Sequence, residues 1–448
     1  MLSPVGMNNQ ERRAAKAKQR HRRGPTAPPE HEDPFAWRAA QHLVRDEASA
    51  LLQGWSRIVA FGSVDRVRFE VTRELLYRNP EVLAAVEDQL VDELWARVAQ
   101  AWEAGWEPRD LVHAARRNAG TGTYVAELVV TEARASGALI SAPQHWRDQV
   151  DELDSAARQP PVRWRPVRDV TGLAAQTKAW TGLLLLLKLL AEVVPLEPIG
   201  PTPSRWGRPT AAPSSSPTDR GRLLNRIRGL LAKAEATDHP AEAETFTAKA
   251  QELMTRHAVE EAVLRGHQHE DVPVASRRVH LQAPYAVVKA ALLDAVARPN
   301  RCRTVLLEGY DIAVLVGAPL DVDQTELLFT SLLIQATRAM AEAGHRRAGS
   351  FDRSATFRRS FLISYATRIG ERLEEANRST TATYGVDLVP LLRRECDAVT
   401  AEFERQFPHT KSLGSGYLDG RGWEAGRTAA DRATLVADRG RLPATSSP

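Results

Sequence analysis

Cysteine is almost absent from this 448-residue sequence, which contains only Cys302 and Cys396. Two cysteines cannot build a framework of several disulfides, so the small disulfide-stapled domains of secreted proteins are excluded. The N-terminal segment has no apolar core behind its positive charges, and we therefore expect no secretory signal. Together these absences predict a protein of the reducing cytoplasm.

Long apolar runs are also missing. The longest, residues 179–194, is shorter than a bilayer span and is interrupted by Lys188 and Glu192. We interpret it as a buried helix and expect no membrane segment. Hydrophobic residues still make up 43% of the chain, which is enough to form ordinary cores, and the length predicts two or three domains.

The net charge is only +4, but positive charge is concentrated near the N-terminus, where Glu11 is the single acid among many bases. Those bases are Arg12, Arg13, Lys16, Lys18, Arg20, Arg22 and Arg23. The composition predicts a disordered basic arm over residues 1–33. Such an arm attracts phosphates in a salt-dependent way, which would suit nucleic-acid binding; the alternative interpretation is a solubilising tail.

Residues 34–194 show helical periodicity almost throughout and no strand-type alternation. We expect helices at 35–55, 64–77, 81–103, 109–135, 144–157 and 172–194, separated by prolines and glycines. Most of the ten tryptophans lie here. Their helical spacing is typical of core residues rather than of side chains that stack on nucleic-acid bases. Residues 195–219 are rich in proline and serine without an apolar period, which predicts a linker between two independent halves.

Residues 220–265 contain two apolar stripes at helical spacing, separated by a break at residues 237–240. The stripes consist of Leu223, Ile227, Leu230, Leu231 and Ala234, then Ala243, Phe246, Ala250, Leu253, Met254 and His257. Proline at position 240 and Glu242 suit the first turn of a helix, because a missing N–H is harmless there and negative charge is favourable. The pattern predicts an αα-hairpin.

The hairpin resembles the domain of unknown function 2786 family over about residues 220–263. The resemblance is carried by Arg226-Ile227-x-x-Leu230-Leu231-Ala232-Lys233-Ala234, by Pro240-x-Glu242-Ala243-Glu244, and by Ala250-Gln251-Glu252-Leu253-Met254 with His257. Residues 289–317 and 357–373 resemble the domain of unknown function 7168, which often accompanies it. The module recurs in bacteria and phages and has no established activity. The resemblance therefore implies a fold for this segment but no biochemical activity.

The remaining C-terminal sequence predicts a small α+β domain over residues 277–410. We expect helices at 285–297, 321–343, 358–378 and 388–407, and two strands at 302–307 and 312–316 around a turn. A glycine-rich segment, a short helix at 423–437 and a frayed tail follow in residues 411–448. The expected fold is therefore mainly α, with a two- or three-stranded antiparallel sheet flanked by helices.

Residues 356–378 form the segment with the clearest functional potential, because arginines fall on or beside an apolar stripe. A cation there requires a partner. The partner is either an anionic ligand held bidentately or an internal carboxylate such as Glu371, Glu374 or Glu375. The candidate anion-binding residues are Arg358, Arg359, Arg368 and Arg372.

Other motifs favour structural interpretations. Cys302 lacks a recognisable base and is expected in the core, and the run from His267 to Asp271 matches no metal signature. Asp321 with Gln324 resembles a capping box, and the glycines of residues 414–426 follow no strand, so they do not form a phosphate loop. We expect no metal and no cofactor.

These observations favour a non-enzymatic binding or interaction protein whose basic surfaces meet an anionic partner, with nucleic acid as the leading example. The alternative is an enzyme of unrecognised type, in which Cys302, the arginine face from Arg358 to Arg372 and His257 line a cleft between hairpin and sheet. In a third interpretation the arginines are all paired internally and serve the fold.

Overall fold

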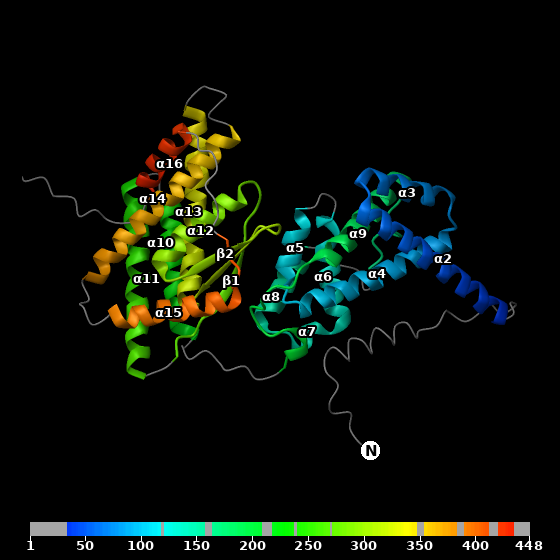
Figure 1. Cartoon of the computed structure of the whole chain (residues 1–448), viewed down its shortest axis with the longest axis horizontal. Coiled ribbons are helices and arrows are strands. Elements are labelled where there is room, and N and C mark those ends of the chain that lie inside the picture. The colour runs from blue at the N-terminus through cyan, green and yellow to red at the C-terminus, as the bar shows by residue number, and fades with distance from the viewer. Residues whose placement is uncertain are drawn as a thin grey trace, which may run out of the picture. The chain divides into compact units, whose positions relative to one another are not determined.

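The computed structural model describes residues 34–117, 121–156, 164–207, 217–236, 240–268, 271–346, 354–382, 389–411 and 420–433. The chain divides into two compact units, residues 1–211 and 212–448. The fold is mainly α, with one small sheet in the C-terminal unit, which confirms the predicted fold class (Figure 1). The basic arm, with all seven of its candidate cations, lies outside the described residues.

The N-terminal unit is helical throughout its described part. Its elements are α2 (Pro34–Phe61), α3 (Val64–Tyr77), α4 (Pro80–Glu103), α5 (Pro108–Arg116), α6 (Gly122–Ser136), α7 (Ala138–Ser141), α8 (Gln144–Ala156), α9 (Leu173–Glu192) and the 3-10 turn η1 (Pro203–Arg205). Two starts follow directly from the sequence: the Ser63 hydroxyl accepts from the Arg66 N–H, and the Asn79 side chain accepts from the Glu81 N–H.

The helix expected at residues 109–135 is two helices. Between them the Thr121 hydroxyl donates to the carbonyl of Ala115, near the end of α5, and α6 begins at Gly122. A side chain that satisfies this carbonyl replaces the next turn of the helix, so the chain changes direction there. Apolar periodicity continues across the break and therefore concealed it.

Tryptophan side chains fill much of the core of this unit. Trp55 packs edge-on against Trp180, and Trp102 packs edge-on against Trp146, with ring centroids 5.1 and 5.6 Å apart. The Trp102 indole N–H donates to the buried carboxylate of Glu132 at 2.9 Å. The expected core role is confirmed for most of the tryptophans of this unit, whereas Trp37 and Trp95 are half-buried.

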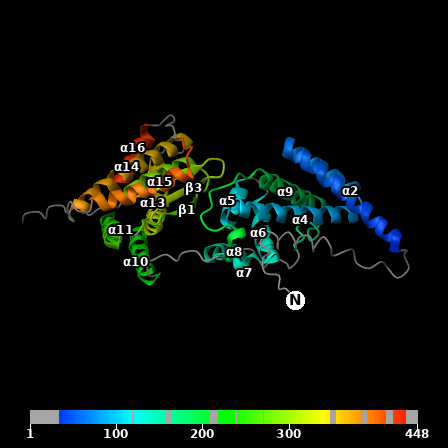
Figure 2. The same ribbon diagram turned by 60° about the horizontal axis from the view of Figure 1, so that its bottom comes forward.

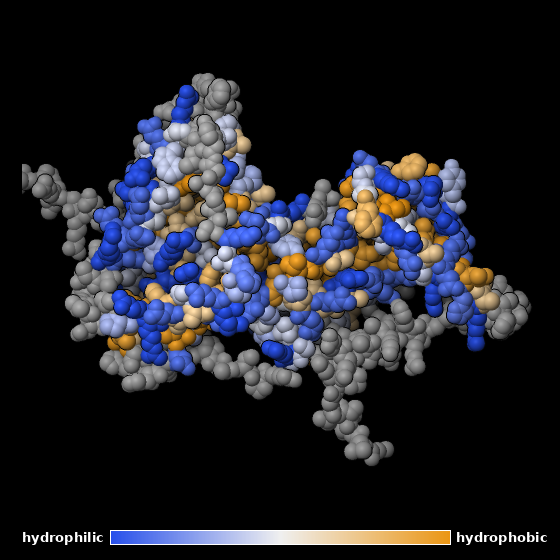
Figure 3. Space-filling model, in the orientation of Figure 1, coloured by the Kyte–Doolittle hydropathy of each residue, from blue (hydrophilic) through white to orange (hydrophobic). Residues whose placement is uncertain are grey.

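Helix α9 is the one described helix that is long and apolar enough to cross a membrane. Leu183, Leu184 and Leu186 are fully buried inside the unit, as in the core helix of a globular domain. Other apolar side chains are exposed over α2 and α3, where Figure 3 shows them at the surface.

The chain that leaves α9 packs against its own unit, although residues 195–219 were assigned to a linker. The Leu196 N–H donates to the carbonyl of Ala104 at 2.9 Å, and the Trp206 ring packs edge-on against Trp146. Leu196 and Trp206 are widely spaced apolar residues, so they produce no periodic pattern and were overlooked. The described part of this segment ends at residue 207.

The C-terminal unit combines the hairpin with the sheet. Its elements are α10 (Pro217–Ala236), α11 (Pro240–Gln268), β1 (Ala275–His280), α12 (Ala286–Ala297), the 3-10 turn η2 (Arg298–Asn300), β2 (Arg303–Leu307), β3 (Ile312–Gly317), α13 (Pro319–Arg346), α14 (Ala355–Ala382), α15 (Val389–Gln406) and α16 (Gly420–Arg432). The three strands pair antiparallel in the order β1-β3-β2. Figures 1 and 2 show helices on both sides of this sheet.

The central strand β3 is buried along its whole length, because it is covered on both faces. Ala313 faces the main core, which is formed by α10 to α14. Val314 and Val316 point to the other face and pack against Val399 and Phe403 of α15. The strand therefore appears in the sequence as a continuous apolar run.

Strand β1 has no counterpart among the predicted elements. Arg277 and Arg278 interrupt the apolar pattern of the strand. The Arg277 charge is compensated by α13, where its guanidinium lies 2.5 Å from Asp323 and 2.8 Å from Glu326. These partners lie more than forty residues away in the sequence. The local sequence therefore does not show that an arginine is compatible with a strand at this position.

The predicted αα-hairpin is present as α10 and α11. Ile227, Leu231, Ala250 and Met254 are buried in the main core, as the two stripes predicted. The ends of the second stripe differ from the prediction. Phe246 is half-buried and His257 is half-exposed, with its Nδ1 atom 3.0 Å from Glu260.

Candidate anion-binding surfaces of the C-terminal unit

The short helix expected at residues 423–437 is present as α16, which begins earlier, at Gly420 within the glycine-rich segment, and packs directly on α14. A Cβ atom on Gly422 would lie 2.5 Å from the carbonyl oxygen of Phe357, and one on Gly426 would collide with the carbonyl of Phe361. The two glycines are four residues apart, so they lie on one face of α16 and let the two backbones approach closely. Glycine serves helix packing at this position.

Two of the four candidate arginines on α14 hold this helix in place. The Arg368 guanidinium contacts Glu371 at 2.7 Å and also Asp431 of α16. Arg372 donates to the carbonyls of Ala430 and Ala433, at the C-terminal end of α16, where unsatisfied carbonyls and the helix dipole favour a cation. The third interpretation, internal pairing, therefore describes Arg368 and Arg372.

The other two candidates have different surroundings. Arg358 is exposed and Arg359 half-buried, and within the described residues neither side chain has an ion pair or hydrogen bond. Arg358 lies about 15 Å along the helix axis from Arg368. The four arginines thus do not converge on one ligand-sized site.

The three groups of the enzymatic alternative each have separate neighbours. Cys302 is buried among Ala297, Leu315 and Val322, and burial raises the pKa of its thiol well above the usual range, so the thiolate is disfavoured. His257 pairs with Glu260, and the arginine face contacts α16. The expectation of a core cysteine is confirmed.

Buried amides occupy the contact between α11 of the hairpin and the α+β elements. The Gln251 amide donates to the side-chain oxygens of Asn300 and Asn377, each at 3.1 Å. The Thr255 hydroxyl donates to Asn377 at 3.2 Å, and Asn377 donates to the carbonyl of Pro299. This network fixes α11 against η2 and α14. Nothing in the sequence singles out this network, because polar residues in separate elements give no local pattern.

A buried ion pair lies beside this network. Arg301 contacts Asp321 through two hydrogen bonds of 3.0 and 2.5 Å, and both side chains are almost fully buried. This corrects the prediction that Asp321 caps a helix. Helix α13 begins two residues earlier because Pro319 suits its first position, and the Asp321 carboxylate is occupied by Arg301.

The exposed side of α10 carries a set of cations that the sequence analysis did not single out. They are Arg222, Arg226, Arg228 and Lys233, and Glu235 is the one acid in residues 221–236. Among the described residues no carboxylate forms an ion pair with Arg226, Arg228 or Lys233. Arg228 contacts the neutral Asn225 at 3.0 Å, and the Lys233 ammonium lies 5.6 Å from the centre of the Phe246 ring.

We name this surface, with Gly229 and Ala232 between the cations, the α10 basic face. Arg338 of α13 adds a further exposed cation at the end of α10, where it donates to the carbonyl of Glu235 at 3.1 Å. The α10 basic face could have been predicted from the sequence, since the apolar stripe of α10 determines which residues of that helix point outward.

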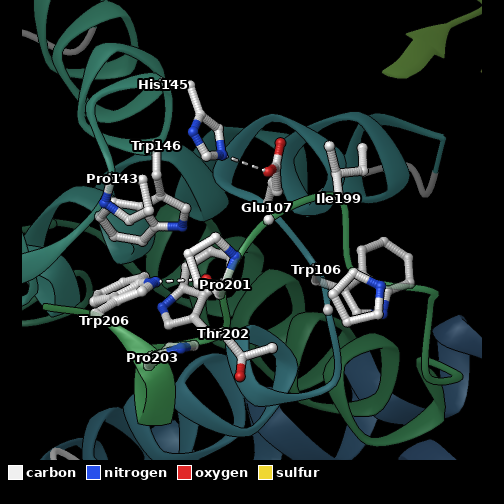
Figure 4. Close-up of a pocket in the computed structure, with 14 residues that line it drawn as sticks. Trp106, Glu107, Pro143, His145, Trp146, Ile199, Pro201, Thr202, Pro203 and Trp206 are labelled. Atoms are coloured by element: carbon white, nitrogen blue, oxygen red, sulfur yellow. Dashed lines mark hydrogen bonds and ion pairs between the residues drawn. The ribbon is translucent and has the colours of Figure 1, made fainter. Parts of the chain in front are cut away.

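A pocket in the N-terminal unit is too small for a substrate. Figure 4 shows it where the segment after α9 meets α5 and α8, lined by Trp106, Trp146 and Trp206 among prolines. His145 contacts Glu107 at 3.0 Å at its edge. Its volume of about 20 Å³ corresponds to roughly one water molecule. It is a packing gap beneath the docked segment.

No group of three histidine, cysteine, aspartate or glutamate side chains suited to a metal ion occurs in the described part of the chain. The run from His267 to Asp271 lies partly outside the described residues.

Comparison with known proteins bears on the hairpin alone. A family model described as a protein of unknown function (DUF2786) matches residues 222–261, which confirms the resemblance of this segment. The comparison gives no corresponding match to the domain of unknown function 7168 downstream. No curated protein and no solved structure matches the chain.

Proposed function

We propose that this protein is a non-enzymatic binding protein of the bacterial cytoplasm, and that its C-terminal unit binds nucleic acid through the α10 basic face. The observation that carries the proposal is the contrast in pairing. Arg226, Arg228 and Lys233 are exposed without carboxylate partners among the described residues, whereas Arg368 of the same unit is engaged internally.

Helix stability does not account for the α10 basic face. Arg222 and Arg226 are four residues apart, and like charges at this spacing destabilise a helix by about 0.2–0.5 kcal/mol. A polyanion would reverse this repulsion, because each phosphate contact neutralises a cation and releases counterions. Gly229 and Ala232 are small and exposed, so they leave the surface between the cations open to a phosphate backbone.

The hairpin and the α+β elements form one binding unit in this proposal. Leu223 and Met254 of the hairpin share a core with Leu293 of α12 and Phe361 of α14. This shared core supports, as part of the proposal, a second module over residues 289–317 and 357–373 that accompanies the hairpin.

The test is fluorescence anisotropy of the full chain with labelled duplex DNA, single-stranded DNA and RNA over a salt series. The triple variant Arg226→Ala, Arg228→Ala, Lys233→Ala should bind more weakly to all three probes. For duplex DNA, the slope of log affinity against log salt should fall by about 0.9 for each phosphate that the variant no longer neutralises. Thermal melting checks that the variant remains folded.

The matched control replaces Arg298 and Arg405 with alanine, since both are exposed arginines of the same unit that pair with carboxylates close to them in the sequence. We expect the control to bind like the parent. A triple variant with unchanged affinity and slope would refute the α10 basic face. If deletion of residues 1–25 alone then abolished binding, the arm would be the binding element.

A further inference from the structure

One face of α2 carries an apolar stripe that nothing in the described N-terminal unit covers. Leu43 and Phe61 are 70% and 93% exposed, although both are large and apolar. Ala50 and Gly54 lie between them on the same side of the helix, because the spacings of seven, four and seven residues each correspond to nearly whole turns. Buried Ala48, Trp55 and Val59 occupy the opposite side. Heptad-like stripes of this kind are typical of helices that pack against another helix.

The middle of the stripe, at Ala50 and Gly54, borders a groove. A Cβ atom on Gly54 would meet no heavy atom within 4 Å, and a groove of about 290 Å³ runs between α2 and α3 at this level. Trp55 lines the groove while 2% exposed, and its indole nitrogen has no hydrogen-bond partner among the described residues. Small residues at the centre of an exposed helix face permit close approach of a second helix.

The residues of the stripe are placed symmetrically about position 52. Leu43 and Phe61 lie nine residues on either side of it, and Ala50 and Gly54 lie two residues on either side. The charged pair Glu47 and Arg57 lies five residues on either side, and both are exposed. A two-fold axis at Leu52 would therefore place unlike residues opposite each other at every one of these positions.

We propose that α2 is a self-association surface, on which the α2 helix of a second copy of this chain packs antiparallel about a two-fold axis at Leu52. Leu43 of one copy then meets Phe61 of the other, and the two small residues cross at the centre. The contact extends over about 27 Å, the length of helix between positions 43 and 61.

Charge complementarity commits the surface to a second copy. In the antiparallel pair each Glu47 faces an Arg57, twice in the dimer, whereas a parallel pair would bring like charges together. Within its own protomer Glu47 already contacts Arg78 at 2.6 Å, and Arg78 contacts Glu74, so its carboxylate is held in a defined position at the edge of the groove. The symmetric placement about position 52 is matched by a second copy of the same helix, and a different protein would not be expected to match it.

Sedimentation velocity of the full chain at increasing concentration tests the association. We expect a monomer–dimer equilibrium in the micromolar range, weakened at least about tenfold by Arg57→Glu or by Glu47→Arg, because each creates two like-charge contacts. The double variant should recover most of the affinity, since it restores two opposite-charge contacts. Melting curves verify that each variant is folded. A monomer at every concentration, or a double variant no better than the singles, would overturn the proposal.

The apolar contacts have a matched control. Phe61→Asp should abolish dimerisation, whereas Phe69→Asp should leave it intact, since Phe69 is also exposed but lies on α3 away from the groove. Equal effects of the two replacements would contradict the proposed surface.

Cross-linking tests the antiparallel register. In a background with the exposed Cys396 replaced by serine, an equimolar mixture of Leu43→Cys and Phe61→Cys should form a disulfide-linked dimer under mild oxidation. Leu43→Cys alone should not, because the two copies of position 43 lie about 27 Å apart. A cross-link in Leu43→Cys alone, or none in the mixture, would exclude this arrangement.

Discussion

Helices α10 and α14 of the C-terminal unit both carry arginines beside an apolar stripe, yet the two sets meet different surroundings. On α14, Arg368 and Arg372 contact α16, which supplies a carboxylate and two terminal carbonyls. On α10, Arg226 and Arg228 face outward, and the helix is held by apolar contacts of residues such as Ile227. Arginines beside an apolar stripe therefore occur on both helices, and the presence of a covering helix decides whether they serve the fold or remain available to a ligand.

The comparison predicts that the hairpin of α10 and α11 depends most on its apolar contacts. Leu253→Ala should lower the free energy of unfolding by roughly 2–5 kcal/mol, because the buried leucine leaves a cavity. Lys249→Ala should have little effect, since this lysine is exposed and forms only a surface pair with Glu252. Phe246→Ala should be intermediate, because its ring is half-buried. Urea denaturation measures all three, and equal losses would show that the buried face of α11 is misassigned.

The contact between α14 and α16 should break when its closest approach is blocked. Gly426→Ala places a methyl group against the Phe361 carbonyl, so α16 must move and stability should fall by about 3 kcal/mol. Gly420→Ala is the control, because a Cβ there meets nothing within 4 Å. Hydrogen exchange should show loss of protection in α16 for the first variant alone. If nucleic-acid binding increased at the same time, the uncovered arginines of α14 would behave like those of α10.

A smaller effect is expected for the capping arginine. Arg372→Ala removes the donor for the carbonyls of Ala430 and Ala433, and we expect a loss of about 1.5 kcal/mol in stability. Arg358→Ala is the matched replacement on the same helix and should leave the melting temperature unchanged, because Arg358 is exposed. Equal melting temperatures for both variants would remove the distinction drawn between covered and open arginines.

The smallest expected effect is a dependence on pH. The hydrogen-bonded Arg368 guanidinium, with Arg427 as a second cation, holds the pKa of Glu371 below its usual range. The stabilisation is therefore complete above the unfolded pKa of about 4.3 and is lost as the pH falls below that value toward the folded pKa. The protection of α16 amides, taken relative to their intrinsic exchange rate at each pH, should fall on acidification, and Glu371→Gln should reduce that fall. No such carboxylate pairs with Arg226 or Arg228 among the described residues, so α10 should show no matching change.

Much of the fold could be predicted because its signals are local. Helix α3 has the predicted bounds, since Ser63 and the apolar spacing of Val67 and Val71 act within the helix itself. Strand β3 was predicted from its apolar run, and the hairpin from its two stripes. In these cases the residues that determine the structure lie within a few positions of each other.

The features that escaped prediction depend on distant partners. Arg277 fits strand β1 only because Asp323 and Glu326 reach it from α13. The helix at residues 423–437 was predicted, but its start at Gly420 was not, because the close contact with α14 that accounts for its glycines involves residues far away in the sequence. Arg368 appeared to be a candidate ligand because Asp431 lies sixty-three residues further along the chain. For the same reason the sequence pointed to the arginines of α14 as the candidate anion-binding site and not to the α10 basic face.

The clustered tryptophans of the N-terminal unit have an optical consequence. Nine of the ten tryptophans lie in residues 1–211, several in edge-on pairs such as Trp55 with Trp180, and Trp423 on α16 is the only one in residues 212–448. Intrinsic fluorescence therefore reports almost entirely on the N-terminal unit. Replacing Trp423 with phenylalanine would make that signal exclusive, and the difference between the two emission traces during unfolding would isolate the detachment of α16 without any added dye.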